Sequence, residues 1–350
     1  MFERAEIDFT CNEEIGAEGR NSRVFKAIDH QLDAQIVVKR IERSDFETED
    51  EYFAEAKLLY DARHPHVVPV KFACRTDAYV FIAMPLYELG SVHSLLQRRF
   101  PTVREMVRIG LDFLTGLHYI HLRGLLHFDI KPSNILIDAS GKAAVTDFGL
   151  AKHVNEKGLA EQDVMYSTHR PPEGFQYDVF AQPADIYQAG LTLYRMAVGL
   201  RSFDSQWQAY QGDHIAAAKA VIVGDLPNRT ASVYPAHIPA RLRNTIRRAL
   251  EPDPDSRYQE VLGLINDLGQ VDEWLDWEYC LTGPVERWEF RAETHLKVIE
   301  LTEIGPSAYT IRAKTIRVSD GSERNSRVLS GEAVTRPAAN RLVRNALTNL

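Results

Sequence analysis

The chain carries the stretch Leu126-His127-Phe128-Asp129-Ile130-Lys131-Pro132-Ser133-Asn134-Ile135-Leu136, followed after ten further residues by Asp147-Phe148-Gly149. Phosphoryl transfer needs an acceptor for the proton of the attacking hydroxyl, oxygen ligands for Mg²⁺ and a fixed cation beside the moving phosphate. Side chains with the right chemistry for these tasks are Asp129, Lys131, Asn134 and Asp147. The apolar runs on either side have strand length, so the pattern predicts a short polar loop between strands that supports phosphoryl transfer.

This combination resembles the catalytic loop and the metal-binding loop of the eukaryotic-type (Hanks-type) serine/threonine protein kinase family. A lone His-x-Asp is a weak signal, whereas His-x-Asp-x-Lys-Pro-x-Asn with Asp-Phe-Gly downstream is specific. The resemblance covers roughly residues 10–270. It implies an α+β fold of two lobes, with a β-rich N-terminal lobe over residues 1–87 and a helical C-terminal lobe over residues 88–275. It also implies ATP and Mg²⁺ as cofactors and a protein as substrate.

The resemblance gives each residue of the two loops a role. It implies that Asp129, Lys131 and Asn134 are catalytic, with Asp129 accepting the proton of the substrate hydroxyl. It implies that the metal ligands are Asn134 and Asp147. Lysine two residues after the catalytic aspartate is typical of the family members that act on serine or threonine. The residues implied to have structural roles in these loops are His127, Phe148 and Gly149.

Residues 15–27 resemble the family's glycine-rich loop, which covers the ATP phosphates. Glycine lets backbone N–H groups approach a phosphate closely because no Cβ intervenes. Two features depart from the family pattern, since Gly16 and Gly19 are separated by two residues rather than one and Ser22 stands where the third glycine usually lies. A plain β-hairpin is the alternative for this segment. The nucleotide contacts implied here are Ile15, Gly16, Gly19 and Val24.

A buried-type run, residues 36–39, ends in Lys39. Taken alone it predicts an ordinary strand with a solvent-facing lysine, whereas the resemblance implies that Lys39 holds the α- and β-phosphates. Apolar spacing predicts a helix over residues 48–62, and Glu55 on it is the implied partner of Lys39, because a partly buried ammonium needs a countercharge. A surface glutamate is the alternative. The other nucleotide contacts implied are Val37, the gatekeeper Met84, the hinge residues Pro85 and Tyr87, and Leu136.

Three charged residues further along match family positions that brace the helical lobe. Asp185 opens a long apolar helix and is implied to anchor the backbone of the catalytic loop. Glu173, in a Pro-Pro-Glu sequence, and Arg257 are implied to form an ion pair. Upstream, apolar side chains at helical spacing predict a helix over residues 103–123.

The residue before the catalytic aspartate is Phe128, where many protein kinases have arginine. That arginine is a buried cation which a phosphate on the activation segment neutralises, and an aromatic ring cannot make such charge-assisted bonds. We therefore expect activity not to depend strictly on phosphorylation of this segment. Tyr166 stands where the family's threonine usually meets the acceptor site. The hydroxyls that could carry a phosphate are Tyr166, Ser167 and Thr168.

The remainder of the chain has a different pattern. Short alternating runs with turn signals between them, and then a helix over residues 336–347 capped by Thr335, predict a four-stranded sheet packed by one helix. We expect residues 285–350 to be a small accessory α+β domain that binds a partner or restrains the kinase, reached through a helical connector over residues 272–278. A solvated face is expected for two basic residues of its helix, Arg341 and Arg344, with a binding patch as the alternative.

Composition limits the class of protein. The 350 residues are 45% hydrophobic and 26% charged, as in ordinary globular proteins. There is neither a membrane-length apolar run nor an apolar signal-peptide core, and the three cysteines are far apart, so we expect a cytoplasmic protein without membrane association.

Of the net charge of −8, residues 287–350 contribute +4 (eleven Lys/Arg, seven Asp/Glu) and residues 1–286 contribute −12. The acidic main unit argues against nucleic-acid binding, an alternative that stays open for the basic tail.

Two other functional classes share parts of this pattern. A pseudokinase or scaffold would bind nucleotide and partners without transfer, but such proteins usually lack at least one of the five polar positions that are filled here: Lys39, Glu55, Asp129, Asn134 and Asp147. A small-molecule kinase of the aminoglycoside or choline sort does not usually combine Asp-x-Lys-Pro-x-Asn with Pro-Pro-Glu and a distant arginine. The expected function is therefore an ATP- and Mg²⁺-dependent serine/threonine protein kinase, whose substrate the sequence does not name.

Overall fold

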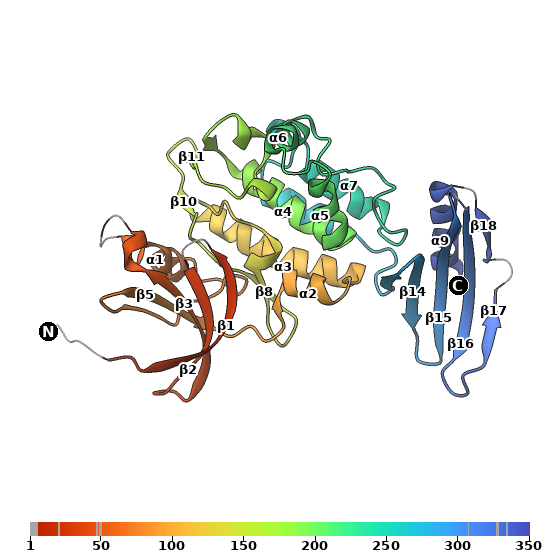
Figure 1. The fold of residues 1–350 in the computed structure, drawn as a ribbon, viewed down its shortest axis with the longest axis horizontal. Helices are drawn as coiled ribbons and strands as arrows, with labels where there is room; N and C mark the ends of the chain where they lie inside the picture. Colours follow the sequence, from red (N-terminus) through yellow and green to blue (C-terminus); the bar gives the residue numbers. More distant parts are fainter. Residues whose placement is uncertain are drawn as a thin grey trace.

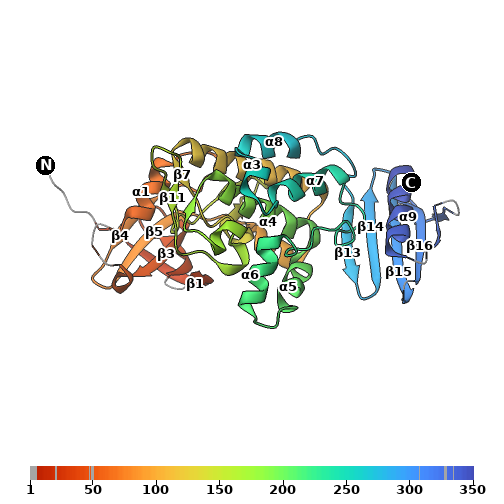
Figure 2. The ribbon, with the colours of Figure 1, turned by 90° about the horizontal axis from the view of Figure 1, so that it is seen from above.

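The computed structural model describes residues 6–19, 22–46, 48, 51–306, 308–326, 329–333 and 335–350. Three parts lie in a row along the long axis: a β-rich lobe, a helical lobe and a C-terminal sheet with one helix (Figure 1). The view from above shows the same order, with the C-terminal sheet at the end opposite the β-rich lobe (Figure 2). The predicted α+β organisation of two lobes and a small C-terminal domain is confirmed.

The N-terminal lobe is an antiparallel sheet with the strand order β1-β2-β3-β5-β4. Val24 lies opposite Lys39, and Val37 lies opposite Met84. Because side chains alternate along a strand and directly opposed residues share a face, these four side chains are on one face of the sheet. The strands are β1 (Phe9–Gly19), β2 (Ser22–Asp29), β3 (Ala34–Glu42), β4 (Phe72–Arg75) and β5 (Tyr79–Pro85).

Helix α1 (Ala54–Asp61) is shorter than the helix predicted over residues 48–62. The hydroxyl of Thr48 donates to the carboxylate of Glu51 (3.1 Å), and the Glu51 N–H donates to the Thr48 carbonyl (3.3 Å). This i→i+3 backbone bond belongs to a tight turn and not to an α-helix, and the regular helix begins at Ala54. Glu55 is still in its first turn, as the predicted pairing with Lys39 requires.

The helical lobe is built around α3 and α4. The predicted helix over residues 103–123 is present as α3 and starts at a capping box, in which Thr102 and Glu105 satisfy each other's backbone N–H groups. Helix α4 is buried along almost its entire length, which explains its apolar sequence. No described helix is long and apolar enough to cross a membrane. The helices are α2 (Val92–Arg98), α3 (Val103–Leu122), α4 (Gln182–Val198), α5 (Leu200–Gln208), α6 (His214–Val223), α7 (Ala240–Ala249) and α8 (Val261–Leu268).

Short strands hold the loops of this lobe. The catalytic loop lies between β7 and β8, and β8 pairs with both β6 and β9. In the segment after Asp-Phe-Gly, β10 pairs with β7 and β11 pairs with β12. The strands are β6 (Gly90–Ser91), β7 (Leu125–Leu126), β8 (Ile135–Ile137), β9 (Ala143–Val145), β10 (Lys152–His153), β11 (Ala160–Glu161) and β12 (Val179–Phe180).

The described part of the C-terminal domain is a six-stranded antiparallel sheet packed by α9, so the prediction of four strands was wrong. Strand β13 lies before the predicted boundary at residue 285, and strands β17 and β18 have three residues each, too few for an alternating pattern to be recognised. The boundary predicted at residue 285 divides the β13–β14 hairpin, and the sheet starts at Glu278. The elements are β13 (Glu278–Thr282), β14 (Val285–Arg291), β15 (His295–Gly305), β16 (Ala308–Arg317), β17 (Glu323–Asn325), β18 (Gly331–Ala333) and α9 (Arg336–Asn349).

This domain packs on the helical lobe through β13 and β14, which lie on the side facing that lobe (Figure 2). Tyr279 and Trp288 of the sheet share an apolar cluster with Phe100 and Ala236 of the lobe. The rings of Phe100 and Tyr279 meet edge to face with centroids 4.8 Å apart. The accessory domain therefore shares part of its core with the helical lobe.

The connector between lobe and sheet is not helical, which corrects the prediction for residues 272–278. The backbone N–H of Arg104 donates to the carbonyl of Leu275 (2.8 Å), and its guanidinium bonds Asp276 (2.8 Å). Trp274 has a φ of +50°, which a helix does not allow.

On α9, Arg341 is exposed as predicted, but Arg344 is half-buried and donates to the Ala236 carbonyl (3.2 Å), so a fully solvated face was wrong for that residue.

Candidate active site

Lys39 is the centre of an ion-pair network that joins the two lobes. Its Nζ lies 2.8 and 2.9 Å from the carboxylate oxygens of Glu55 on α1, and 2.8 Å from Oδ1 of Asp147, which follows β9. Burial alone would lower the pKa of Lys39, but the charges of Asp147 and Glu55 outweigh it and hold this pKa above its usual value. Burial would likewise raise the pKa of Asp147, yet Lys39 lowers it to about 2. The network thus holds a charged lysine and a charged Asp147 in place.

Asp129 has one carboxylate oxygen engaged and one without a partner. Its Oδ2 accepts from Nδ2 of Asn134 (2.7 Å) and lies 2.9 Å from Nζ of Lys131. Its Oδ1 is buried and has no hydrogen-bond partner among the described residues. Burial raises the pKa of Asp129 to about 6, against the opposing charge of Lys131. The carboxyl therefore offers a free acceptor that is mostly ionised at neutral pH.

The catalytic loop is held by hydrogen bonds from α4. The carboxylate of Asp185 accepts from the backbone N–H groups of His127 and Phe128, both at 2.8 Å, and its Oδ2 bonds Nε2 of His121 (2.8 Å). Phe128 has a φ of +64°, an unfavourable region for a bulky residue, so these bonds hold a strained backbone. The anchor implied for Asp185 is thus present. Sequence reasoning missed its partner His121.

A second anchor, Gln188, was also missed. Its Oε1 accepts from the Ile130 N–H (3.0 Å) and its Nε2 donates to the Phe128 carbonyl (2.9 Å). Gln188 is one helical turn after Asp185, so both side chains are on one side of α4. A polar residue at that spacing in an otherwise apolar helix is the signal that could have identified it.

An apolar cluster lies beside this network. It contains Val24, Val37, Met84, Tyr87 and Leu136, which are the predicted nucleotide contacts of this type. The hydroxyl of Thr146 donates to the sulfur of Met84 (3.8 Å). Pro85 ends β5 opposite Ile36, and the Tyr87 carbonyl accepts from the N–H of Gly90 (3.0 Å). Leu86, within the predicted hinge, also packs in this cluster, and sequence reasoning missed two apolar members that lack a motif, Val68 and Ala144.

The segment predicted as a glycine-rich loop is the β1–β2 hairpin. Gly16 lies opposite Val24, and Gly19 lies opposite Ser22. Ile15 is exposed, with 41% of its surface accessible. Arg20 and Asn21, at the tip of the predicted loop, lie outside the described residues. Contact of this hairpin with phosphates stays a prediction.

The other residues predicted to have structural roles make the following contacts. Arg257 is buried and forms two parallel bonds with Glu173, of 2.8 Å from Nη1 to Oε1 and 2.7 Å from Nη2 to Oε2. The His127 ring meets Phe148 edge to face (centroids 5.0 Å apart), and burial lowers the pKa of His127. Gly149 follows Phe148 in the chain, and a Cβ at this position would lie 3.4 Å from Oδ1 of Asp147.

The three predicted phosphorylation sites have different surroundings. Ser167 is exposed, whereas the hydroxyl of Thr168 bonds Nδ1 of His169 (3.1 Å). The ring of Tyr166 lies over Nζ of Lys131. Phe128 is buried in an apolar cluster with Ala160 of β11 and with Phe180 of β12, whose ring it meets edge to face at 5.6 Å.

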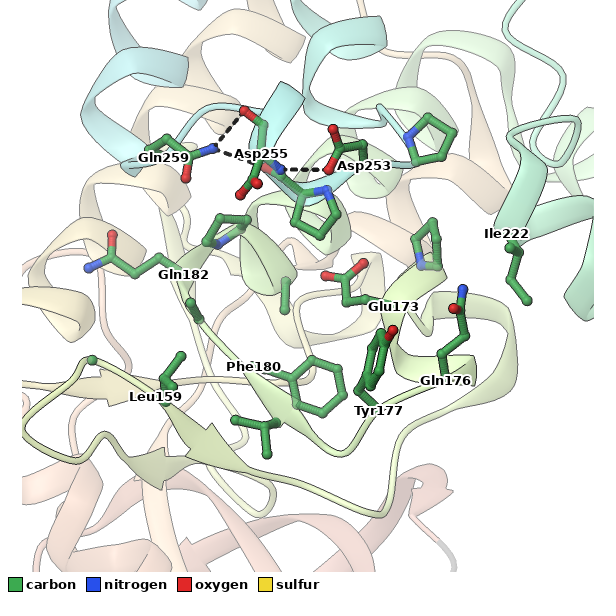
Figure 3. A pocket seen from close by; sticks show the side chains of 18 residues that line it. Leu159, Glu173, Gln176, Tyr177, Phe180, Gln182, Ile222, Asp253, Asp255 and Gln259 are labelled. Atoms are coloured by element: carbon green, nitrogen blue, oxygen red, sulfur yellow. Dashed lines mark hydrogen bonds between the residues drawn. The ribbon is translucent and has the colours of Figure 1, made fainter.

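A separate cavity of about 800 Å³ lies in the helical lobe, and Figure 3 shows the side chains that line it. Leu159, Tyr177 and Phe180 line its apolar side, and Asp253 and Asp255 stand at its rim. Its lining includes Glu173, the partner of Arg257, but not Lys39, Asp129 or Asp147. The candidate active site is therefore the region around Lys39 and Asp129, and not this cavity.

Comparison with known proteins agrees with this geometry. A family model described as protein kinase domain matches residues 9–266. The probable serine/threonine-protein kinase PknB of Lactococcus lactis is 26% identical over 264 residues, which are 73% of this chain and 40% of that protein. A probable serine/threonine-protein kinase of Clostridium perfringens is 29% identical over 261 residues (73% and 37%), and PknD of Chlamydia abortus is 27% identical over 335 residues (83% and 34%). The matches thus span less than half the length of these relatives.

Proposed function

This chain belongs to the protein kinase domain family, and from that premise we propose that it is a serine/threonine protein kinase that transfers the γ-phosphoryl group of ATP to a protein hydroxyl. The observation that carries the proposal is Oδ1 of Asp129, a buried acceptor with no partner among the described residues, beside Lys131 and Asn134. A buried acceptor without a partner is costly and calls for an explanation, and a substrate hydroxyl placed beside Lys131 and Asn134 would supply the missing donor. In the proposed reaction the substrate hydroxyl donates to this oxygen.

The oxygen ligands of the site suit Mg²⁺ bound together with ATP. Asn134 bonds Asp129 through its Nδ2, its Oδ1 accepts only a long bond from the Ser133 hydroxyl (3.5 Å) among the described residues and could also bind a metal, and Asp147 is held ionised by Lys39. Mg²⁺ is usually held by one or two protein oxygens together with substrate phosphates. Bound Mg·ATP would supply the phosphoryl group and part of the charge neutralisation. Asn134 and Asp147 would hold the metal, and Lys39 would hold the α- and β-phosphates.

The chain's own groups then act mainly by position and charge. Asp129 orients the hydroxyl and accepts its proton, and with a pKa of about 6 it is ionised in most molecules at neutral pH. Lys131 places a positive charge beside the reacting oxygen. The transition state of phosphoryl transfer is loose, so holding these groups in place accounts for most of the proposed catalysis.

The surroundings of Phe128 support activity without phosphorylation of the activation segment. Its ring fills an apolar cluster that includes Ala160 and Phe180, one from each strand of the short β11–β12 sheet. Apolar packing therefore holds the activation segment at this point. In a kinase with arginine at the position of Phe128, a phosphate on the segment would be needed to neutralise that arginine. We propose that its order does not depend strictly on a phosphate.

The C-terminal domain is proposed to bind a partner or to restrain the kinase. Its place against the helical lobe leaves the far strands of the sheet, β16 to β18, away from both lobes (Figure 1). Ion pairs of Arg287 with Glu289 and Glu300 give one sheet surface a charged character.

The test is incubation of the purified chain with radiolabelled ATP, Mg²⁺ and a generic basic protein. Label on serine or threonine of either protein is the expected result, with Asp129→Asn as the inactive control. Nucleotide binding without transfer in the wild type would favour a scaffold instead. Phosphoamino-acid analysis that yields mainly phosphotyrosine would refute the serine/threonine assignment.

A further inference from the structure

Lys131 is held between a carboxylate and an aromatic ring. Its Nζ lies 2.9 Å from Oδ2 of Asp129 and 3.6 Å from the centroid of the Tyr166 ring. The Lys131 side chain is only 10% accessible, so water solvates its charge poorly. The face of an aromatic ring carries negative electrostatic potential and attracts a cation, most strongly where water is excluded. The ring face is thus a second electrostatic contact of this ammonium.

Tyr166 does not reach Lys131 from a freely moving segment. Its carbonyl accepts from the His169 N–H (3.0 Å), which closes the short helical turn η4 (Ser167–His169). The buried His169 ring accepts a hydrogen bond at Nε2 from Nη1 of Arg195 on α4 (2.9 Å). Because Nε2 accepts, Nδ1 carries the proton and donates to the Thr168 hydroxyl (3.1 Å). The backbone of Tyr166 is therefore tied to the same helix that anchors the catalytic loop.

We propose that Tyr166 is a positioning residue for phosphoryl transfer, whose ring face orients the ammonium of Lys131 beside Asp129. This inference rests on the proposed kinase function. The proposed ring contact differs from a contact made by a hydroxyl group, because a ring face cannot donate a hydrogen bond to Asp129. The ring therefore does not compete with a substrate hydroxyl for Oδ1 of Asp129. An ammonium has three N–H groups. With one directed to Asp129 and one to the ring, the third is left for an oxygen of the transferring phosphoryl group.

The kinetic test separates ring electrostatics from packing and from the phenol hydroxyl. Tyr166→Phe keeps the aromatic ring face and removes only the hydroxyl. Tyr166→Leu keeps an apolar side chain of similar bulk but removes the ring face. We expect kcat to fall roughly tenfold in Tyr166→Leu, with the KM for ATP little changed, and to be largely restored in Tyr166→Phe. Phenylalanine analogues with one, two or three ring fluorines at position 166 should lower kcat stepwise, because fluorine weakens the ring potential at nearly constant size. Tyr177→Leu, at an exposed tyrosine beside the separate cavity, is the matched control.

A double-mutant comparison tests whether the effect acts through Lys131. In a Lys131→Met background, Tyr166→Leu should produce no further loss of kcat. Equal losses in Tyr166→Phe and Tyr166→Leu would assign the role to the hydroxyl and overturn the proposal. A flat fluorine series, or wild-type kcat in Tyr166→Leu, would overturn it as well.

A measurement without turnover separates this inference from the kinase assignment. In the full chain with isotope-labelled lysine, the side-chain protons of Lys131 should be shifted upfield by the ring current of Tyr166, with the signal identified by its loss in Lys131→Met. The shift should persist in Tyr166→Phe and vanish in Tyr166→Leu. An unshifted Lys131 signal in the wild type would overturn the inference even if the protein transfers phosphate. A shifted signal in a protein without transfer would support the contact and contradict the kinase assignment.

Discussion

The indole N–H of Trp288, on β14 of the C-terminal sheet, donates a hydrogen bond of 3.0 Å to Nδ1 of His237 in the helical lobe. Both side chains are fully buried, and Tyr279 packs beside the imidazole with the ring centroids 5.0 Å apart. Because Nδ1 accepts this bond, it must be the unprotonated nitrogen. The junction between lobe and domain thus depends on a neutral histidine.

Acid should weaken this junction. Burial lowers the pKa of His237 to about 3, whereas an unfolded histidine titrates near about 6.5. Between these values the unfolded chain binds a proton that the folded chain does not, so stability falls as the pH decreases through this range. His237→Gln keeps an acceptor for Trp288 but does not titrate. We predict that the unfolding free energy of His237→Gln depends less steeply on pH than that of the wild type, with slopes that differ by up to about 1.4 kcal/mol per pH unit. Denaturant titrations between about pH 7 and pH 5 measure this, and identical slopes would contradict it.

The hydrogen bond at the junction should be measurable by itself. Trp288→Phe preserves apolar contact but leaves Nδ1 of His237 buried without its donor, at a cost of about 1–3 kcal/mol beyond the lost packing. Trp207→Phe is a useful control, because the indole nitrogen of Trp207 has no partner within the described residues. Chemical unfolding of the two variants gives the comparison. A smaller loss for Trp288→Phe than for Trp207→Phe would count against a stabilising role for the bond.

The pH dependence of transfer should report Asp129. Its pKa, raised to about 6 chiefly by burial, means that protonation below that pH removes the acceptor for the substrate proton. We therefore predict that kcat/KM for ATP rises with pH through about 6 and then levels off. The charge of Asp147 also raises this pKa. A divalent cation there should oppose that effect, so the acidic limb of kcat should lie at lower pH than that of kcat/KM. A rate that is constant down to about pH 5 would exclude Asp129 as the acceptor.

Two aspartates should differ in what their loss removes. Asp129→Asn should retain nucleotide binding and lose about 10²–10³ in kcat, by analogy with the loss of one electrostatic anchor. Asp147→Asn should instead lose Mg²⁺-dependent ATP binding, because it removes a metal ligand. Isothermal titration with and without Mg²⁺, together with transfer assays, distinguishes them. Asp178→Asn, at an exposed aspartate of the helical lobe, controls for charge alone. Wild-type transfer by Asp129→Asn would show that the loop has been assigned wrongly.

Activation-segment hydroxyls should matter little. Since Phe128 is packed in an apolar cluster, a phosphate on Ser167 or Thr168 has no buried arginine at that position to neutralise. We predict that Ser167→Ala and Thr168→Ala each change kcat by less than about tenfold, under ~1.4 kcal/mol. Steady-state kinetics before and after phosphatase treatment check this. Near-complete loss of activity on dephosphorylation, recovered as phosphate returns to residues 150–170, would refute it.

Much of the candidate site was predictable because its signals are local. Asp129, Lys131 and Asn134 lie within six residues, and Asp147-Phe148-Gly149 follows closely. The catalytic motif can therefore be recognised from one short stretch of sequence. Helix ends were also predictable where one side chain caps a nearby backbone group. Thr335 accepts from the N–H of Ala338, and α9 starts there as expected, although it extends to Asn349.

The parts that were missed depend on contacts between distant segments. Gln188 carries no motif, and its role exists only because α4 passes beneath the catalytic loop 58 residues earlier in the chain. Residues 272–277 have helical composition, yet bonds from Arg104, far upstream, hold their backbone in another path.

Local sequence therefore decides which chemistry this chain carries, because catalytic spacing, strand alternation and helix caps all act over a few residues. Tertiary structure alone decides which of those groups meet. It brings Lys39 to Asp147 across 108 residues, Tyr166 to Lys131, and Trp288 to His237. The physical reason is that burial and pairing energies depend on neighbours in space, and apolar residues such as those around Phe128 or Trp288 do not specify their partners by their own identity.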